Sequence, residues 1–495
     1  MTEIAERKAG HEEVDGSSYM QILRSTAVIG GSSLVNVAFS VIRMKTIAVL
    51  LGPGGVGLIS LYMSIVDLSQ TVAGLGIQSS GVRQIAEAKG EGGDARVQRV
   101  AGVLLRVSLI LAIGGALFLA ALSIPVSVIT FGSDGHAANI VVLSGCVFFG
   151  LLSSGQLALL QGLRRVADLA RVSMLSAFFS AAITIPVIYL MAEDGIVPSL
   201  VCSAAASFGV AFWYRTKAGG GPGHMSPGSV AAEVGDLLRL GVVFMASGLL
   251  TVGAAYSIRL IVLKADGVNG AGLYQAAWAL GGLYAGFILQ AMGTDFYPRL
   301  TAAAHDNVRC NRLVNEQAHI SILLAGPGLL ATLTIAPLLM TVFYSSEFGA
   351  AADLLRLLCI GMMLRVIAWP VGFIVLAKGA RKIFFWTEVA ATVVHVGLAW
   401  MLVERMGVTG AGAAFVGLYL WHAALIYRVA NSLSGFRWAP RPLLQGLAYL
   451  AAATASFVSF QVLPTTDAIL LGLGMAAVGG LYSLSELWKI LPFRR

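Results

Sequence analysis

Charged side chains inside otherwise apolar segments are the residues of this chain best placed to do chemistry. Six are cations and two are acids: Arg43, Lys45, Arg106, Arg259, Arg356 and Arg365 against Asp67 and Glu388. A charge near the centre of a bilayer costs at least about 2.5–3.5 kcal/mol on insertion scales, so it requires a partner or a ligand. The excess of cations favours an anionic ligand, because a carrier of cationic drugs should present more acids.

Helical spacing places several of these charges on polar stripes. One stripe contains Ser32, Asn36, Ser40 and Arg43, and another contains Ser60, Ser64, Asp67, Thr71 and Gln78. Polar stripes on membrane helices face protein or water, because lipid cannot satisfy them. We therefore predict a wet cavity whose substrate-binding residues are Asn36, Arg43, Lys45, Gln78, Arg259 and Arg365. The alternative is that the small polar residues only let helices pack closely.

An acid and a titratable imidazole, Glu388 and His395, are seven residues apart and share one helical face. Such a pair can relay protons. We therefore predict that coupling to H⁺ or Na⁺ uses Glu388, Asp67 or His395. The alternative is structural, with a hydrogen-bonded histidine and a glutamate paired with an arginine. We interpret His422 as structural.

The stretch "AVLLGPGGVGLISLY" contains a G-x-G-x-x-G match at Gly52, Gly54 and Gly57. A dinucleotide site also requires a preceding strand, a following helix and an acidic residue about 20 positions on. Here the match separates two apolar segments and contains Pro53. We interpret it as a tight hairpin in which glycine adopts a positive φ. The sequence also lacks the G-x-x-x-x-G-K-[ST] phosphate loop.

The elements that must position these residues are membrane helices. Of 495 residues, 57% are hydrophobic and 12% are charged, and the mean hydropathy is +0.82, whereas a soluble chain is about 25% charged. The expected fold is an all-α polytopic membrane protein with about 14 transmembrane helices. The apolar segments lie at 22–50, 57–79, 100–122, 138–161, 172–191, 196–214, 237–263, 271–293, 315–340, 352–376, 383–403, 409–427, 443–463 and 468–488.

Cysteine spacing and charge placement exclude other classes of protein. The four cysteines form no C-x-x-C pair, so we expect no disulfide framework, no metal site and no cofactor. The net charge of +8 is not gathered into a basic patch with interleaved aromatic residues. We therefore expect no nucleic-acid partner.

The chain repeats itself with an offset of 215 residues. Identical pairs include Arg24 and Arg239, Ser32 and Ser247, Gly52 and Gly267, and Gly57 and Gly272, so we expect the tight turn at Gly52 to recur at Gly267. Six segments therefore precede a second six in the same orientation, an arrangement in which transporters place the substrate site between the halves. We predict a cytoplasmic tail over 1–21, an N-terminal six-helix lobe over 22–215, a cytoplasmic linker over 216–236, a C-terminal six-helix lobe over 237–430, and two additional helices with a cytoplasmic C-terminus over 431–495.

Two stretches carry a resemblance to a known family. The segments "VIRMKTIAVLLGPGGVGLISLY" and "LRVIAWPVGFIVLAKGARKIFFWTEVAATVVHVGLAW" resemble polysaccharide-transport flippases, the Wzx branch of the MOP superfamily, of the O-antigen or lipid III translocase type. The resemblance covers most of the chain from about residue 22 to 430. It implies a MATE-like fold with two six-helix lobes around a central cavity that opens alternately to each side. It also implies that Arg43, Arg259 and Arg365 form the family's cationic cavity.

The resemblance implies a flippase of the bacterial inner membrane, not an enzyme. Its cargo would be undecaprenyl-pyrophosphate-linked oligosaccharide for O-antigen, exopolysaccharide or related glycan synthesis, and its partners that cargo, the bilayer and polysaccharide polymerase machinery. A polar cavity suits this cargo, because pyrophosphate and sugar hydroxyls need a polar route across the hydrocarbon while the lipid tail can stay in the bilayer. Two alternatives remain open: a MATE-type drug or cation antiporter, and a membrane polysaccharide polymerase or ligase, which the short outside loops disfavour.

Lysine and arginine are concentrated in alternate loops. The loops "LRRVADLAR" and "KGARK" lie on one side, and "GPGG" and "AEDG" on the other, where only Lys264 and Arg405 are basic. Since Lys/Arg-rich loops stay in the cytoplasm, both termini are predicted to be cytoplasmic. A reporter that is active only in the periplasm should be silent when fused after Arg495 and active when inserted at Asp194. Activity after Arg495 would overturn the topology.

Overall fold

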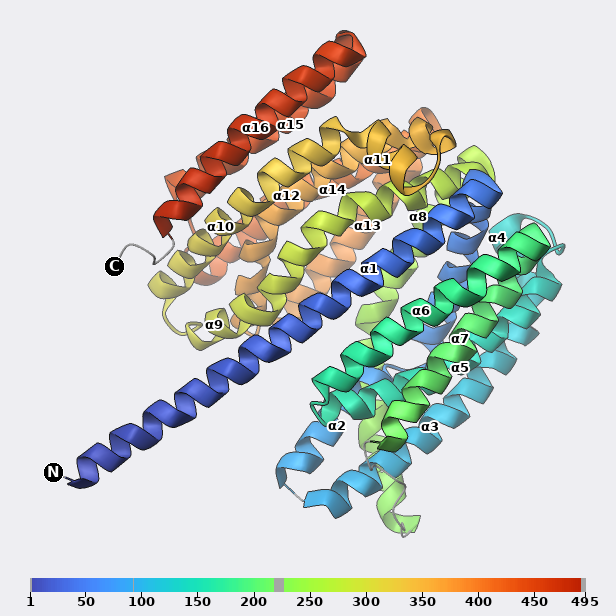
Figure 1. The fold of residues 1–495 in the computed structure, drawn as a ribbon, viewed down its shortest axis with the longest axis vertical. Coiled ribbons are helices and arrows are strands. Elements are labelled where there is room, and N and C mark those ends of the chain that lie inside the picture. Colours follow the sequence, from blue (N-terminus) through green and yellow to red (C-terminus); the bar gives the residue numbers. More distant parts are fainter. Residues whose placement is uncertain (1, 92, 218–226, 491–495) are drawn as a thin grey trace. The chain divides into compact units, whose positions relative to one another are not determined.

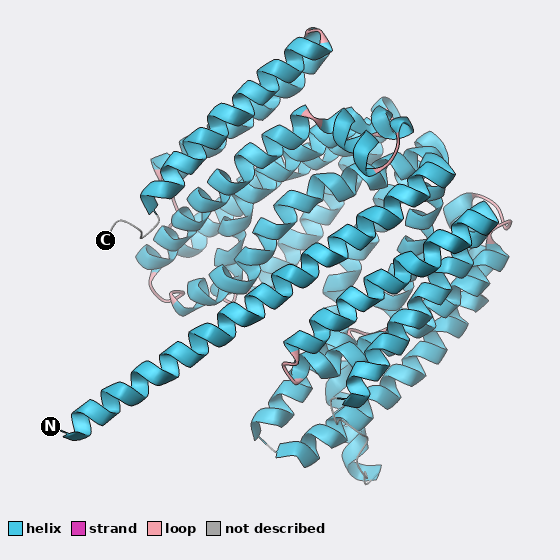
Figure 2. Cartoon of the chain, viewed as in Figure 1, coloured by secondary structure: helices cyan, strands magenta, loops and turns pink. Residues whose placement is uncertain are grey.

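The computed structural model describes residues 2–91, 93–217 and 227–490, and this part of the chain consists of helices and connecting turns without strands (Figures 1 and 2). The all-α prediction is therefore confirmed. Helical backbone is what a membrane requires, because it satisfies every N–H and C=O within the segment.

Eleven helical stretches in the described residues are long and apolar enough to cross a membrane. Three of them, Gly31–Ala73, Val166–Lys217 and Glu233–Gln290, are each divided into two arms, by Gly52, by a 3₁₀ turn and by Gly267 respectively. Eleven stretches with three additional arms give fourteen, which confirms the prediction of about 14 membrane helices. The protein is a multi-pass membrane protein.

The helices follow one another along the chain with short connections. The first part of the chain contains α1 (Thr2–Ala73), α2 (Ile77–Glu91), α3 (Gly93–Ala121), α4 (Ser123–Phe131), α5 (Ala137–Gly162), α6 (Val166–Met191), η1 (Ala192–Gly195) and α7 (Ile196–Lys217). The second contains α8 (Pro227–Ala291), η2 (Met292–Phe296), α9 (Tyr297–Ala302), α10 (Asn307–Thr334), α11 (Ala336–Phe343), η3 (Ser346–Ala351), α12 (Ala352–Ala377), α13 (Arg381–Met406), α14 (Thr409–Ser434), α15 (Pro440–Val462) and α16 (Thr465–Ile490).

Packing divides the chain into two compact units. One contains Met1–Leu50 and Tyr62–Val252, and the other contains Leu51–Leu61 and Gly253–Arg495. These units differ from the lobes drawn from the repeat, whose boundaries stay a prediction. Helix α1 already begins at Thr2, so the predicted polar tail continues the first membrane helix (Figure 1). Residues 218–226 of the predicted linker lie outside the described residues.

The two hairpins predicted from the glycines are present. Gly52 has φ 62° and Gly267 has φ 69°, the positive values that reverse each helix into its second arm. These two glycines are 215 residues apart (267 − 52), so the same turn occurs at the same place in both repeats. The glycine match in the sequence is therefore a hairpin and not a phosphate cradle.

In the second unit the two hairpins pack backbone to backbone. A Cβ atom added to Gly57 would overlap the carbonyl oxygen of Val268, and one added to Gly272 would overlap that of Pro53. Val268 and Pro53 are also 215 apart (268 − 53), so the contact is reciprocal between the repeats. Glycine is required at both positions because no side chain fits between the two backbones.

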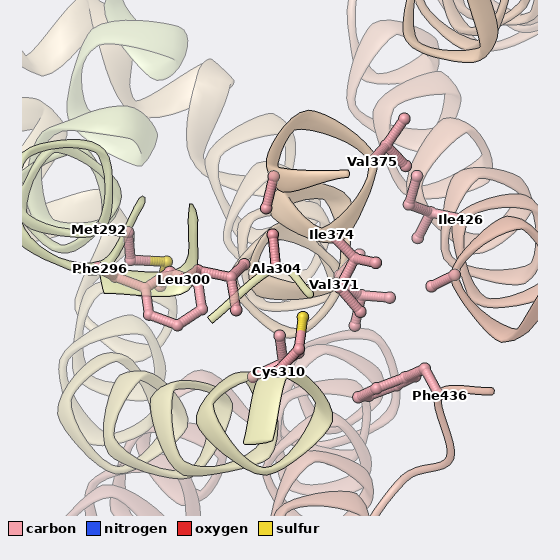
Figure 3. Close-up of a cluster of buried hydrophobic side chains, with 14 residues drawn as sticks. Met292, Phe296, Leu300, Ala304, Cys310, Val371, Ile374, Val375, Ile426 and Phe436 are labelled. Atoms are coloured by element: carbon pink, nitrogen blue, oxygen red, sulfur yellow. The ribbon is translucent and has the colours of Figure 1, made fainter. Parts of the chain in front are cut away.

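A buried apolar cluster fixes helix α12 in the second unit (Figure 3). Val371, Ile374 and Val375 of α12 pack with Cys310 of α10 and Ile426 of α14. The cluster lies within three turns of Arg365 on the same helix, and it therefore sets which face of α12 carries the charge.

The two C-terminal helices, α15 and α16, are present as predicted and pack against α10. Tyr449 of α15 donates through its hydroxyl to the carbonyl oxygen of Gly479 in α16 (2.6 Å). Side chains of these three helices line a largely apolar cavity of about 680 Å³.

The reciprocal glycine contact predicts a large effect of one added methyl group. We expect Gly57→Ala to lower the free energy of unfolding by about 1–3 kcal/mol, because the added Cβ would overlap backbone that cannot move aside. The matched control is Gly253→Ala in α8, where nothing lies within 4 Å of the added Cβ. This control should be neutral or stabilising by about 0.5–1 kcal/mol. Equal unfolding curves for the two variants in detergent would contradict the packed hairpins.

Candidate functional site

In the first unit, the arm of α1 before the hairpin is joined to α6 by two hydrogen bonds. The Asn36 amide donates to Oγ of Ser173, and the Arg43 guanidinium donates to Oγ of Ser180, both at 2.5 Å. Asn36 and Arg43 are seven residues apart, as are Ser173 and Ser180, so the two bonds lie about two helical turns from one another. The predicted stripe thus faces a neighbouring helix at these positions.

Each of these two side chains has a further polar atom that takes no part in the hydrogen bonds to α6. Among the described residues, Asn36 Oδ1 and Arg43 Nε are buried and have no hydrogen-bond partner. A buried polar atom without a partner costs about 1–3 kcal/mol, and more if it is charged. These are therefore atoms that a polar ligand would satisfy.

Lys45 and Asp67, also on α1, differ in their surroundings. Lys45 is half-buried and Asp67 is exposed, and each interacts with a neighbouring group. Ser60 and Ser64, earlier on the stripe of Asp67, are buried. The serines at the beginning of this stripe are therefore buried, whereas its acid, Asp67, is exposed.

The structure corrects the prediction that Gln78 continues the stripe of Asp67. Helix α1 ends at Ala73, and the chain turns at Leu75 and Gly76, whose φ values are 46° and 64°. Gln78 therefore belongs to α2, a separate helix, and its side chain is exposed. Its role in substrate binding stays a prediction.

In the second unit, Arg259 is held across the hairpin of α8. Its Nε and one terminal nitrogen donate to Oε1 of Gln275, at 3.3 and 2.9 Å. Arg259 lies eight residues before Gly267 and Gln275 lies eight after it (267 − 259 and 275 − 267), so the turn itself brings the two side chains together. Arg259 is half-buried.

Arg365 of α12 lies among aromatic rings. Its guanidinium carbon is 4.5 Å from the ring centre of Trp369, one turn further along α12, and 5.8 Å from that of Tyr419 in α14. Cation–π contacts of this kind contribute about 0.5–2 kcal/mol. Among the described residues, its Nε is buried and has no hydrogen-bond partner. The rings contact the cation but offer no acceptor to this donor.

Three titratable side chains gather around Arg365. Glu388 and His395 of α13 and His422 of α14 all lie within electrostatic range of its guanidinium. The His395 ring lies 5.8 Å from Phe415, and the His422 ring lies 5.8 Å from Tyr419. The structure thus brings together one predicted substrate residue, Arg365, and two predicted coupling residues.

Sequence reasoning missed the aromatic and imidazole part of this cluster. His422, which we interpreted as structural, has a buried Nδ1 without a hydrogen-bond partner in the described part of the chain. Trp369 and Tyr419 were not predicted at all. Two spacings could have indicated them, namely Trp369 four residues after Arg365 and His422 three residues after Tyr419, since such pairs share a helical face.

The cluster combines a fixed cation with one carboxyl group and two imidazoles. An anion can pair with Arg365, and the carboxylate of Glu388 would compete with that anion. Protonation of Glu388 removes this competition, and so the arrangement can link anion binding to a proton.

The fold is shared with solved structures of membrane proteins. The structure is similar to an inward-facing MATE transporter of the MOP superfamily, with a TM-score of 0.67 and 18% identity over 85% of this chain and 96% of that one. It is also similar to the lipid II flippase MurJ in an inward closed conformation, with a TM-score of 0.72 and 12% identity over 94% of this chain and 99% of that one. The fold is therefore MATE-like, as the resemblance implied.

The sequence defines the family. The polysaccharide biosynthesis protein family matches residues 46–353, more than half of the chain, and the chain belongs to this family. Among characterised relatives, the lipid III flippase of Escherichia coli K12 is 21% identical over 82% of this chain and 97% of its own length.

Proposed function

We propose that the protein is a flippase that moves undecaprenyl-pyrophosphate-linked oligosaccharide across the bacterial inner membrane by alternating access, for O-antigen, exopolysaccharide or related glycan synthesis. The observation that carries this proposal is Arg365, a cation inside a membrane helix whose Nε lacks a hydrogen-bond partner among the described residues. Membership in the polysaccharide biosynthesis protein family supports a glycan precursor as the cargo. Two similar proteins, named lipid II and lipid III flippases, support movement of a lipid-linked molecule.

The pyrophosphate is the part of this cargo whose transfer from water into hydrocarbon costs the most free energy. In the proposal, Arg43, Arg259 and Arg365 supply the positive charge that replaces its hydration. Asn36, Lys45 and Gln78 supply further polar contacts. The guanidinium geometry suits this task because one arginine can donate two parallel hydrogen bonds to one phosphate group. The lipid tail stays in the bilayer.

Ion coupling in this proposal acts through Glu388. A proton, or a Na⁺ ion at the same carboxylate, would neutralise Glu388 and free Arg365 for the pyrophosphate. His395 lies on the same helix and could pass the proton on. Asp67 of α1 is the second candidate carboxylate.

An antiporter of drugs or organic cations is the alternative, since the MATE fold is shared. The charges inside the membrane segments favour the anionic cargo, because cations outnumber acids there by six to two. Transport of organic cations by the purified protein, with no response to lipid-linked sugar, would replace the flippase proposal with this alternative.

The proposal predicts that removing one arginine strongly reduces export while the protein stays folded. We expect Arg365→Ala and Arg259→Ala to reduce polymer export at native expression by about 10- to 100-fold, the equivalent of a lost charged hydrogen bond of about 1.5–3 kcal/mol. Lysine at these positions should restore export partly if charge suffices, and poorly if bidentate phosphate contact is needed.

Two further variants separate function from folding. Arg365→Met keeps most of the side-chain volume, and we expect its unfolding temperature to be unchanged or higher, because an incompletely paired, half-buried charge does not stabilise a fold. Arg312→Ala is the matched control, since this arginine is exposed and forms an ion pair with Glu316. Normal export by both alanine variants at 259 and 365 would rule out the cationic site.

Coupling can be tested in proteoliposomes with an imposed pH or Na⁺ gradient. We expect Glu388→Gln to lose gradient-driven transport and keep cargo binding, because the neutral amide cannot take up or release a cation. Asp67→Asn is the comparison variant for the other half of the chain. If both variants respond to the gradient like the wild-type protein, neither carboxylate couples transport to an ion.

A further inference from the structure

The cavity of about 680 Å³ between α10, α15 and α16 has an apolar body and a polar end. The body is lined by side chains such as Leu330 of α10 and Leu470 of α16, and the polar end by Gln445 of α15 and Tyr482 of α16. None of the residues around Arg365 lines this cavity. It is therefore separate from the candidate site.

The walls of the cavity are held at a fixed spacing by Tyr449 of α15. A Cβ atom added to Gly326 of α10 or to Gly479 of α16 would lie 2.6 or 2.9 Å from atoms of this ring, so the ring fills the space that the two glycines leave. The Tyr449 hydroxyl donates to the carbonyl oxygen of Gly479 and lies 2.6 Å from Oγ of Ser483. The walls are preorganised, which lowers the cost of binding a ligand between them.

The length of the cavity suits one hydrocarbon chain. Leu470 and Tyr482 are the first and last residues of α16 that line it, and twelve residues (482 − 470) extend about 18 Å along a helix. One leaflet is about half of a hydrocarbon core of about 30 Å. Leu444, Leu470 and Val478 of the lining are exposed, so the cavity is open along its side.

Hydrogen bonds join the three helices at the polar end. Nδ1 of His319 in α10 lies 2.5 Å from Oε1 of Gln445, and Nε2 of Gln445 donates to the Tyr482 hydroxyl at 2.7 Å. One polar group of each helix therefore lies at the same level.

Charged residues lie one turn beyond these hydrogen bonds. Arg441 precedes Gln445 by four residues on α15, and Glu486 follows Tyr482 by four residues on α16. Residues four apart share a helical face, so both charges lie on the faces that line the cavity. The carboxylate of Glu486 is within electrostatic range of Arg441, which confirms that the two helices bring these charges together.

The balance of these charges favours an anion. Glu486 forms an ion pair with Lys489 (2.5 Å), and Arg441 is exposed. Among the described residues of this cluster, two cations face one acid, a net charge of +1 (2 − 1). Glu316, one turn before His319 on α10, does not change the balance, because it is paired with Arg312.

The polar end lies at the edge of a membrane-spanning segment. Arg441 is the second residue of α15, and the described connection 435–439 separates this helix from the end of α14. Trp438 of the connection and the exposed Trp488 of α16 are of the type that membrane–water interfaces favour. Lipid phosphates occupy this level, and basic residues between membrane helices bind them.

We propose that this cavity binds an anionic phospholipid, with one acyl chain along α16 and the phosphate at Arg441. Apolar walls alone would not select a lipid, because all chains are equally apolar. The selection comes from the cationic end, where a guanidinium can donate two hydrogen bonds to one phosphate. The site does not rest on the proposed flippase activity.

The test uses the full chain in phosphatidylcholine nanodiscs that contain a small fraction of phosphatidylglycerol with the same acyl chains, and native mass spectrometry counts the lipids that stay bound. The wild-type protein should retain phosphatidylglycerol in preference to phosphatidylcholine. Arg441→Gln should reduce the retained phosphatidylglycerol by about tenfold, because a charged hydrogen-bond donor is lost. Glu486→Gln should increase it, because the acid that opposes the phosphate is removed. Such a gain cannot come from misfolding.

A second variant tests the place of the acyl chain. Gly474 lines the cavity, and nothing lies within 4 Å of a Cβ atom added to it. Gly474→Leu should therefore fill the cavity without displacing protein atoms. We expect it to remove the preference for phosphatidylglycerol and to leave the unfolding temperature unchanged.

Two controls match these variants in chemistry. Arg83→Gln changes an exposed arginine beside a glutamate in the first unit, and Gly209→Leu fills equally open space on α7. Unchanged retention in Arg441→Gln or in Gly474→Leu would overturn the proposal. So would an equal loss in either control, or a loss in Glu486→Gln.

A long-chain isoprenyl phosphate, added at the same concentration as phosphatidylglycerol, tests the other class of lipid. Retention of phosphatidylglycerol by the wild-type protein supports the proposal. Replacement by the isoprenyl phosphate would overturn the assignment to a phospholipid.

Discussion

A guanidinium inside a membrane helix is the constraint on which the second unit depends. Hydrocarbon cannot solvate the charge of Arg365, so the surrounding protein must do so. Trp369 and Tyr419 supply ring faces, and Glu388 supplies an opposite charge at longer range. The solvation is incomplete, because Nε has no hydrogen-bond partner among the described residues. A buried donor without a hydrogen-bond partner lowers the stability of the fold. A ligand that supplies the partner would add the same free energy to its own binding.

Close approach of backbones is the second organising feature. Gly57 and Gly272 let two hairpins touch in one unit, and in the other unit a Cβ atom at Gly76 would overlap the carbonyl oxygen of Gly241. Membrane helices gain little from burying apolar side chains against one another, because lipid is equally apolar. Small residues instead let two backbones come close enough for favourable dispersion interactions between them. These close contacts are also the ones that one methyl group abolishes.

The sequence alone determined the features that depend on local pattern. Apolar length predicts the membrane helices, and the glycines at 52 and 267 predict the hairpins, since a reversal needs a positive φ that glycine adopts without strain. The offset of 215 residues predicts that the same turn occurs twice. The presence of cations within the spans could also be read directly, because charge stands out against an apolar background.

Only the tertiary structure decided which side chains meet. Gln78 leaves the stripe of Asp67 because the chain turns at Leu75, a leucine with a positive φ, and no local preference predicts that conformation. His422 and Tyr419 join Arg365 because α14 packs on α12 through residues such as Val371 and Ile426, more than fifty positions apart. Helical period fixes the face on which a residue lies, but the helix that covers this face is chosen by the packing of the whole unit.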